Sequence, residues 1–244
     1  MLEICCGSFE DAWNAYQGGA RRIELNSALF LGGLTPTTAC LNMVKAETDL
    51  EVVCMVRPRG AGFCYTEPQV RQMFAEAKEL LDHGSDGLAF GFLTQDGEVD
   101  EKNTKEMVDL IHSYGKTAVF HRAFDCVKEP YETAEKLIRL KVDRILTSGL
   151  EEKAWDGIPV LRELVDRYGS QIQILAGSGV NAGNARELME KTGVSQVHSS
   201  CRDWVQDPTT RGEKVGYSFG PVPHEDDYDG VSRELVRKMV ELKL

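Results

Sequence analysis

Short runs of strand-forming residues alternate with amphipathic helical segments along almost the whole sequence, and this alternation restricts the possible folds more than any other feature. Each run is rich in β-branched or other apolar residues, which favours a strand. The eight runs are Leu2–Cys6, Arg22–Asn26, Glu51–Arg57, Gly87–Phe92, the start of Thr117–Asp125, Asp143–Thr147, Gln171–Ala176 and Ser195–His198. Such alternation implies right-handed βαβ units and a parallel sheet.

Eight such units in 244 residues predict a closed α/β barrel, the (β/α)8 barrel of the TIM type, in a single domain over residues 1–244. An open doubly wound sheet is the alternative. It is disfavoured because no GxGxxG follows the first strand and because an open sheet leaves edges to protect. We expect residues 202–230, which lack a clear pattern, to form a long loop that could cover the barrel mouth, and residues 231–243 to form a C-terminal helix.

The composition and the N-terminal sequence limit the kinds of partner that the protein is expected to bind and the cellular compartment in which it is expected to lie. Lysine and arginine number 28 against 39 aspartates and glutamates, giving 28 − 39 = −11, which disfavours binding to nucleic acid or to an anionic membrane. The N-terminus has no basic region and no long apolar stretch, so we expect neither a signal peptide nor a membrane span, and a cytoplasmic location. The seven cysteines are scattered without a CxxC pair, which argues against a disulfide scaffold and a structural zinc site.

In a barrel of this type, the active site lies in the loops at the carboxyl ends of the strands. Polar residues follow several of the predicted strands at that end. Because side chains alternate along a strand, Glu24 faces the barrel interior if Asn26 does, and Met55 accompanies Arg57. These strand ends predict a polar site at the mouth.

Two features of these loops suit an anion. Gly177, Ser178 and Gly179 precede a predicted helix, and His198 and Ser199 end the last strand, at the position where many barrels bind phosphate. The glycines could equally make tight turns and nothing more. Arg57 and Arg59 could hold a carboxylate or phosphate bidentately, or form structural ion pairs with a strand-end acid such as Glu24.

Proton transfer and metal binding each have a candidate. His121 could act as a general acid or base with Asp125 or Glu24. It could instead be a structural histidine whose ring nitrogens are hydrogen-bonded within the protein and connect two strands. A hard divalent ion bound by Glu24, His121 and Asp125 is a variant. Cys5, if it faces inward with Glu3, is a candidate ligand for a soft metal such as Cu(I), although a buried cysteine in a first strand is most often a small hydrophobe.

The sequence lacks the residues that several common enzyme classes require. No lysine lies at the carboxyl end of a predicted strand, which counts against Schiff-base aldolase chemistry. No HxH follows the first strand, as the common zinc hydrolases of this fold require, and no GxSxG or P-loop occurs.

Several motifs together resemble the CutC family of copper homeostasis proteins. They are LEICC, RRIEL with GGLTP, VRPRG with FCYTE, DGLAFGFL with DGEVD, FHRAFD, RILTSG and VHSS, spread over roughly residues 2–200. The resemblance implies a cytoplasmic α/β barrel, often a homodimer, that handles copper. It also implies Cu(I) ligands at the ends of the first two strands. Cys5 matches the first, but Asn26 replaces the second cysteine, and an amide is a poor Cu(I) ligand.

Two functions of different class are therefore open. In the first, a copper homeostasis protein binds intracellular Cu(I) through Cys5, with Met55 as a further soft donor. In the second, an enzyme of unknown reaction acts on a small substrate that carries a phosphate or carboxylate. Its site residues would be the family-matching set Glu24, Arg57, Arg59, His121, Arg122, Asp125, Thr147 and Ser148, with Gly177–Gly179 as the phosphate cradle.

Overall fold

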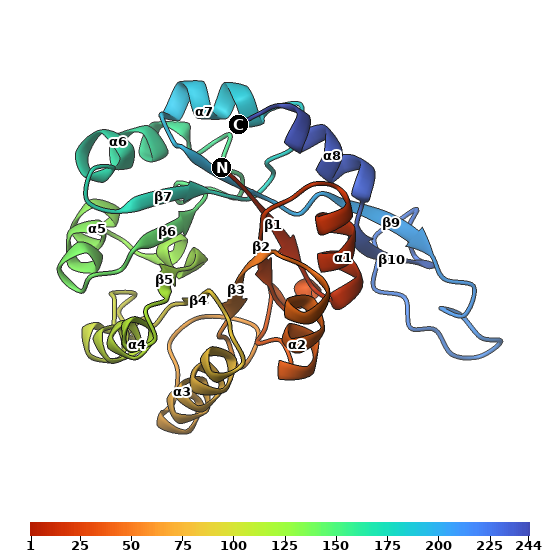
Figure 1. The fold of residues 1–244 in the computed structure, drawn as a ribbon, viewed down its shortest axis with the longest axis horizontal. Coiled ribbons are helices and arrows are strands. Elements are labelled where there is room, and N and C mark those ends of the chain that lie inside the picture. Colours follow the sequence, from red (N-terminus) through yellow and green to blue (C-terminus); the bar gives the residue numbers. More distant parts are fainter.

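The computed structural model describes residues 1–244 and contains a closed barrel of eight parallel strands that alternate with helices up to the last strand (Figure 1). The barrel strands are β1 (Leu2–Cys6), β2 (Arg22–Leu25), β3 (Glu51–Met55), β4 (Gly87–Phe90), β5 (Thr117–Phe120), β6 (Arg144–Thr147), β7 (Gln173–Ala176) and β8 (Gln196–Ser199). They pair in sequence order, and β8 returns to β1. The predicted TIM-type barrel is confirmed.

Helices surround the barrel on its outside (Figure 1). They are α1 (Phe9–Gln17), α2 (Thr38–Glu47), α3 (Glu67–Asp82), α4 (Glu101–Ser113), α5 (Pro130–Arg139), α6 (Ile158–Tyr168), α7 (Ala185–Thr192) and α8 (Arg233–Glu241). Short polar side chains cap several of them: Ser8 accepts a hydrogen bond from the Asp11 N–H, and Ser232 accepts one from the Leu235 N–H. Two short 3-10 helices, Leu29–Leu31 and Arg122–Cys126, lie in the loops after β2 and β5.

Two hydrophobic cores hold the barrel, because its strands are apolar on both faces. Outward-facing side chains such as Ile4, Ile23 and Val52 belong to a cluster of 50 buried residues between strands and helices. Inward-facing side chains form a separate cluster of six inside the barrel. Its members are Val53, Met55, Ala89, Val119, Leu146 and Leu175. This inner cluster forms the apolar floor beneath the barrel mouth.

The segment expected as a long loop differs from the prediction. Its first residues form β9 (Arg202–Gln206), which pairs antiparallel with β10 (Asp227–Val231). The strands were missed because most of their side chains are exposed, so no buried alternation marks them. Residues 207–226 between them project from the barrel as an arm (Figure 1). None of the helices combines the length and the apolar character needed to cross a lipid bilayer.

Candidate functional site

A cavity of about 320 Å³ opens at the carboxyl ends of the barrel strands. Its walls come from the ends of the strands, from the loops after β2 and β3, and from the hairpin of β9 and β10. The polar lining residues are Cys5, Glu24, Asn26, Arg57, His121, Arg122, Ser178, His198, Ser200, Arg202 and Asp229, and the larger apolar ones are Leu29, Met55, Phe63 and Leu146. The cavity therefore lies where enzymes and binding proteins of this fold place their ligands.

Three potential metal ligands converge on one side of this cavity. One ligand atom from each of Cys5, Glu24 and His198 lies within 4.8 Å of the other two. Cys5 and Glu24 are register partners on β1 and β2, and the Cys5 thiol donates to Glu24 Oε2 at 3.9 Å. His198 comes from β8, which is the other neighbour of β1. Barrel closure thus assembles the group from three adjacent strands.

A buried ion network orients His198. Its Nδ1 lies 2.9 Å from Glu3 Oε1, and the second oxygen of Glu3 lies 2.8 Å from Arg22 Nε and 3.6 Å from Arg144 Nη1. With Nδ1 engaged by a carboxylate, Nε2 remains for the side that Cys5 occupies. A carboxylate behind a histidine is the arrangement that commonly orients metal-bound imidazoles.

The protonation states of these groups follow from burial and neighbouring charge. Burial opposes the charged form of His198, but hydrogen bonds with Cys5 and Glu3 and the charge of Glu24 outweigh it and hold the His198 pKa well above its usual range. Burial raises the pKa of Cys5 and also that of Glu24. Burial would also raise the pKa of Glu3, but the His198 hydrogen bond and the charges of His198, Arg22 and Arg144 hold it below its usual range. A metal bound by Cys5 and His198 must therefore displace one proton from the thiol and one from the imidazolium.

Asn26, which stands where the resemblance implies a second cysteine, is part of the same group. Its Nδ2 donates to Glu24 Oε2 at 2.9 Å and to Cys5 Sγ at 3.7 Å. Gly33 approaches the other side of this amide so closely that a Cβ on Gly33 would lie 2.4 Å from Asn26 Oδ1. The amide holds Glu24 and Cys5 in place without contributing a thiolate.

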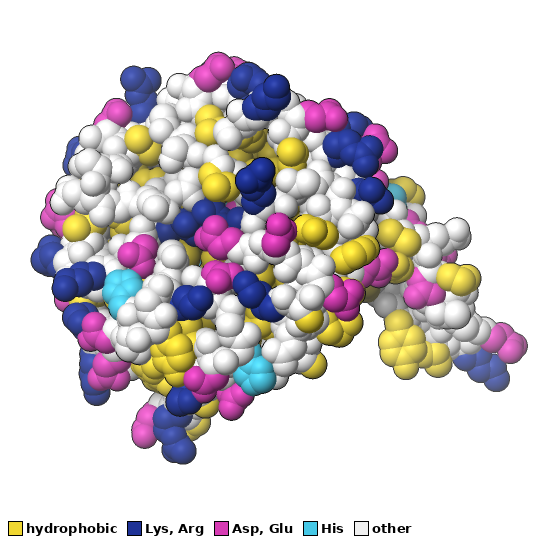
Figure 2. Space-filling model, viewed as in Figure 1, with side chains coloured by type: hydrophobic (Ala, Val, Ile, Leu, Met, Phe, Trp, Pro, Cys, Tyr) yellow, Lys and Arg dark blue, Asp and Glu magenta, His cyan; other side chains and the backbone are white.

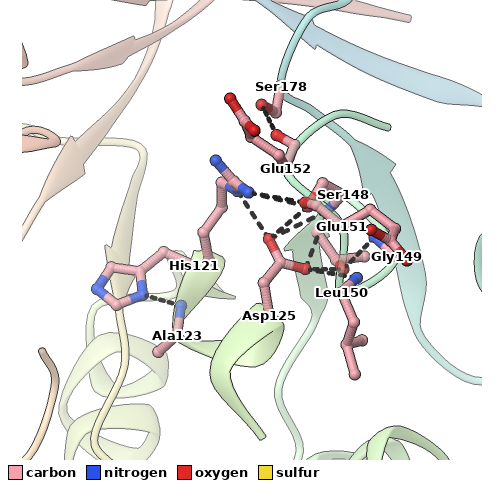
Figure 3. Close-up of polar contacts among 11 residues, drawn as sticks. His121, Ala123, Asp125, Ser148, Gly149, Leu150, Glu151, Glu152 and Ser178 are labelled. Carbon is pink, nitrogen blue, oxygen red and sulfur yellow. Dashed lines mark hydrogen bonds and ion pairs between the residues drawn. The ribbon is translucent and has the colours of Figure 1, made fainter. Parts of the chain in front are cut away.

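His121 and Asp125 do not form the predicted pair. His121 Nδ1 accepts a hydrogen bond from the Ala123 N–H at 3.1 Å, and its ring points away from Asp125 (Figure 3). Burial, together with the charge of Arg57, lowers the pKa of His121 to about 3, so the ring is neutral. Because Nδ1 is the acceptor, the single ring proton lies on Nε2. The hard-ion site of Glu24, His121 and Asp125 is likewise not assembled, since Glu24 groups with Cys5 and His198 instead.

Asp125 instead organises the loop after β6. Its carboxylate accepts hydrogen bonds from the backbone N–H groups of Ser148 and Leu150 and from the Thr147 hydroxyl (Figure 3). Arg122 donates through Nε to Asp125 at 2.7 Å and through Nη2 to the Ser148 hydroxyl at 2.9 Å. Of this set, Arg122 lines the cavity, while Asp125 and Ser148 are not among the lining residues.

The two arginines after β3 do not form a joint anion clamp. Arg57 lines the cavity, but its Nη1 donates to the carbonyls of Leu31 and Gly33 and its Nη2 to that of Ala61. Arg59 is absent from the cavity wall, because its guanidinium bonds carbonyls of its own loop and stacks on Tyr65. Both groups pin loops together, and Arg57 alone remains available to a ligand.

Only some residues of the predicted phosphate-binding loop line the cavity. Ser178 and Gly179 line it, and Ser178 has a left-handed φ of 79°. The Ser178 hydroxyl is already bonded to the Glu152 carbonyl. Ser199 points outward, donating to the Val180 carbonyl, because it alternates with the inward-facing His198. Gly177 packs against Leu146 and His198 outside the lining.

Sequence reasoning missed several site residues. Phe63, whose ring centroid lies 4.9 Å from that of His121, comes from the loop after β3. Arg202 and Asp229 form an ion pair of 3.2 Å across β9 and β10 at the cavity rim. The partnership of Glu3 with His198 could have been found from strand alternation once β1 and β8 were taken as neighbours in a closed barrel. Phe63 and the hairpin carried no comparable signal.

The fold and this cavity define a TIM-type barrel protein with a polar cavity at the carboxyl-terminal mouth. The model of the CutC family matches residues 1–203. The chain is 42% identical over 240 residues to the CutC family protein of Treponema denticola, covering 98% of this chain and 97% of the relative. It is 37% identical to the human copper homeostasis protein cutC homolog, covering 83% of this chain and 73% of the relative. The chain therefore belongs to the CutC family.

Solved structures agree with this placement. The CutC structure from Streptococcus agalactiae superposes with a TM-score of 0.77 at 28% identity, covering 82% of this chain and 98% of that one. The phosphoribosyl anthranilate isomerase of Thermococcus kodakaraensis superposes with a TM-score of 0.56 at 13% identity, over 99% of this chain and 97% of that one. The second likeness shows the barrel fold alone.

Proposed function

We propose that this protein takes part in copper homeostasis by binding Cu(I) at Cys5 and His198, with Glu24 beside them. The observation that carries the proposal is the convergence of these three side chains, with ligand atoms within 4.8 Å of one another at the barrel mouth. Thiolate and imidazole are suitable donors for Cu(I). The mouse and human relatives, both named copper homeostasis protein cutC homolog, support the assignment.

The donor set also suits a second metal, and the experiment must separate the two. A carboxylate is a hard ligand, and sulfur, nitrogen and oxygen donors together occur in zinc sites. The test is an anaerobic titration of reduced protein with Cu(I), and separately with Zn²⁺, against a competing chelator. We expect stoichiometric Cu(I) binding that is lost in Cys5→Ser and weakened in His198→Gln.

Cys64→Ser and Cys126→Ser are the matched controls, because both thiols are exposed and lie outside the cavity. They should bind Cu(I) as the wild type does. Unchanged binding in Cys5→Ser would disprove the site, and tight Zn²⁺ binding with weak Cu(I) binding would disprove the choice of metal.

Two further properties belong to this proposal. A cytoplasmic location is supported by the cysteines, all seven of which are free thiols. A homodimer is supported by the exposed apolar side chains of the arm, which Figure 2 shows in yellow on the projecting part of the molecule. Among the arm residues, Tyr217 and Val222 are each 80% exposed. Sedimentation velocity of the full chain, compared with a Tyr217→Ser variant, tests the second property. An unchanged dimer in the variant would exclude Tyr217 from the interface.

A second candidate function is catalysis on a small anionic substrate at the same mouth. The observation that favours it is a buried acid in the cavity: burial raises the pKa of Glu24, as in general acids of enzymes. His198 and Cys5 would then bind or exchange protons with the substrate. Turnover of small phosphorylated or carboxylated compounds, abolished by Glu24→Gln, would support this function. Turnover unaffected by that change would exclude Glu24 as the acid.

A further inference from the structure

Two buried N–H groups on the cavity wall have no hydrogen-bond partner. They are Nε of Arg57 and Nε2 of His121. Arg57 is 6% exposed and His121 is 2% exposed, so bulk water does not compensate either group. A buried donor left unpaired costs roughly 1–3 kcal/mol, and such groups in native proteins usually mark an absent ligand or water.

The other donors of Arg57 explain why its Nε matters. Nη1 donates to two loop carbonyls and Nη2 to one, and these carbonyls carry no charge that would balance the guanidinium. No carboxylate pairs with Arg57, whereas the deeper Arg22 and Arg144 share Glu3. A buried cation that lacks an acidic partner leaves an uncompensated positive charge at the cavity wall.

His121 is placed beside this site by packing. Phe63 contacts both residues: the Arg57 guanidinium carbon lies 5.0 Å from the centre of its ring, and the His121 ring centroid lies 4.9 Å from it. The Ala123 N–H holds His121 Nδ1, so Nε2 carries the proton and can only donate. The two free donors thus belong to side chains packed on one aromatic ring.

We propose that the cavity binds a small organic carboxylate, whose oxygens accept hydrogen bonds from Arg57 Nε and His121 Nε2. A carboxylate matches two N–H donors and one uncompensated positive charge. A phosphate needs more donors than these two side chains supply, and the Ser178 hydroxyl is already bonded to the Glu152 carbonyl. The body of the ligand would lie on the apolar wall that includes Leu29, Met55 and Leu146, in a volume of about 320 Å³.

This inference deepens the second candidate function, because it names the ligand class of the mouth, and it does not depend on copper. The test is calorimetric titration of metal-free protein with sodium acetate and sodium glycolate, with inorganic phosphate as a comparison anion at constant ionic strength. We expect saturable carboxylate binding, weakened about tenfold or more in His121→Phe, which keeps the ring but removes the donor.

His83→Phe is the matched control and should bind acetate as the wild type does, because His83 is exposed at the end of α3 and lies outside the cavity wall. The nitrogen and proton resonances of His121 Nε2–H, followed by NMR in the wild type, give a second readout that does not depend on any variant folding. They should shift on addition of acetate in proportion to occupancy.

The outcomes separate the proposals. Absence of saturation with both carboxylates, unchanged affinity in His121→Phe, or phosphate binding that acetate does not displace would each overturn the inference. Carboxylate binding that persists in Cys5→Ser would support it even if copper binding fails. Carboxylate binding without turnover would support this site while counting against the catalytic function.

Discussion

His198 Nδ1 lies 2.9 Å from Glu3 Oε1 although 195 positions separate the two residues in the chain. They are register partners across the contact between β1 and β8 that closes the barrel. The same strand places Cys5 two residues beyond Glu3, opposite Glu24 on β2. One seam of the barrel therefore holds both the candidate metal ligands and the carboxylate that orients one of them.

Glu3 is expected to be a stabilising residue as well as a positioning residue. Glu3→Gln leaves the buried guanidinium groups of Arg22 and Arg144 without a counter-charge, so we expect the free energy of unfolding to fall by about 3 kcal/mol. Urea unfolding monitored by circular dichroism measures this change. Glu234→Gln, which breaks the exposed pair with Lys238 on α8, should have no measurable effect. Equal effects of the two substitutions would contradict this account of the network.

Position 26 offers a gain-of-function test of the metal site. Since Asn26 Nδ2 lies 3.7 Å from Cys5 Sγ, a thiol introduced there would lie next to the first one. We expect Asn26→Cys to raise the Cu(I) affinity at least about tenfold, because a second thiolate suits this ion better than an amide. Anaerobic chelator competition provides the measurement, with Asn26→Ser as the size-matched control. The same affinity in both variants would argue against Cu(I) binding at Cys5.

His121 should make the protein more sensitive to acid. Its pKa is about 3 in the folded protein, against an ordinary value of 6.5, because of burial and the charge of Arg57. Below about pH 6.5 the His121 imidazole is therefore protonated in the unfolded chain, whereas it stays neutral in the folded protein. The resulting stability is fully present above that pH and declines as the pH falls toward 3.

We expect His121→Phe to reduce the loss of unfolding free energy between pH 7 and pH 5 by about 2 kcal/mol. Urea unfolding at a series of pH values tests this. His83→Gln, at an exposed position at the end of α3, should keep the wild-type pH dependence. A pH dependence of His121→Phe that matches the wild type would mean that the ring is not neutral in the folded state.

The residue beneath His121 is also predicted to be critical. A Cβ at Gly91 would lie 2.6 Å from His121 Cε1 and 2.7 Å from the Cβ of Ala123. Gly91→Ala should therefore displace the imidazole, lower the free energy of unfolding by about 1–3 kcal/mol, and weaken acetate binding. Gly62→Ala, where no heavy atom lies within 4 Å of the new Cβ, should change neither quantity. Wild-type acetate affinity in Gly91→Ala would show that the ring position does not matter for binding.

By itself, the sequence determined the barrel, because alternating strand and helix patterns at this length have few ways to bury their apolar faces. Strand alternation also placed Glu24 with Asn26, and Met55 with Arg57, on the inner face, and all four line the cavity. The family motifs identified the chain as a CutC protein, as the family model and relatives confirm.

Only the tertiary structure decided which polar residues meet. The register across the closing strands brought His198 to Glu3 and Cys5, and the fold of the loop after β6 took Asp125 away from His121. Backbone carbonyls of nearby loops accept the hydrogen bonds that the Arg57 and Arg59 guanidinium groups donate, so these groups do not form a joint anion site. Local patterns report which face a residue occupies, whereas hydrogen-bond partners depend on strands and loops that are distant in sequence and are brought together only when the barrel closes.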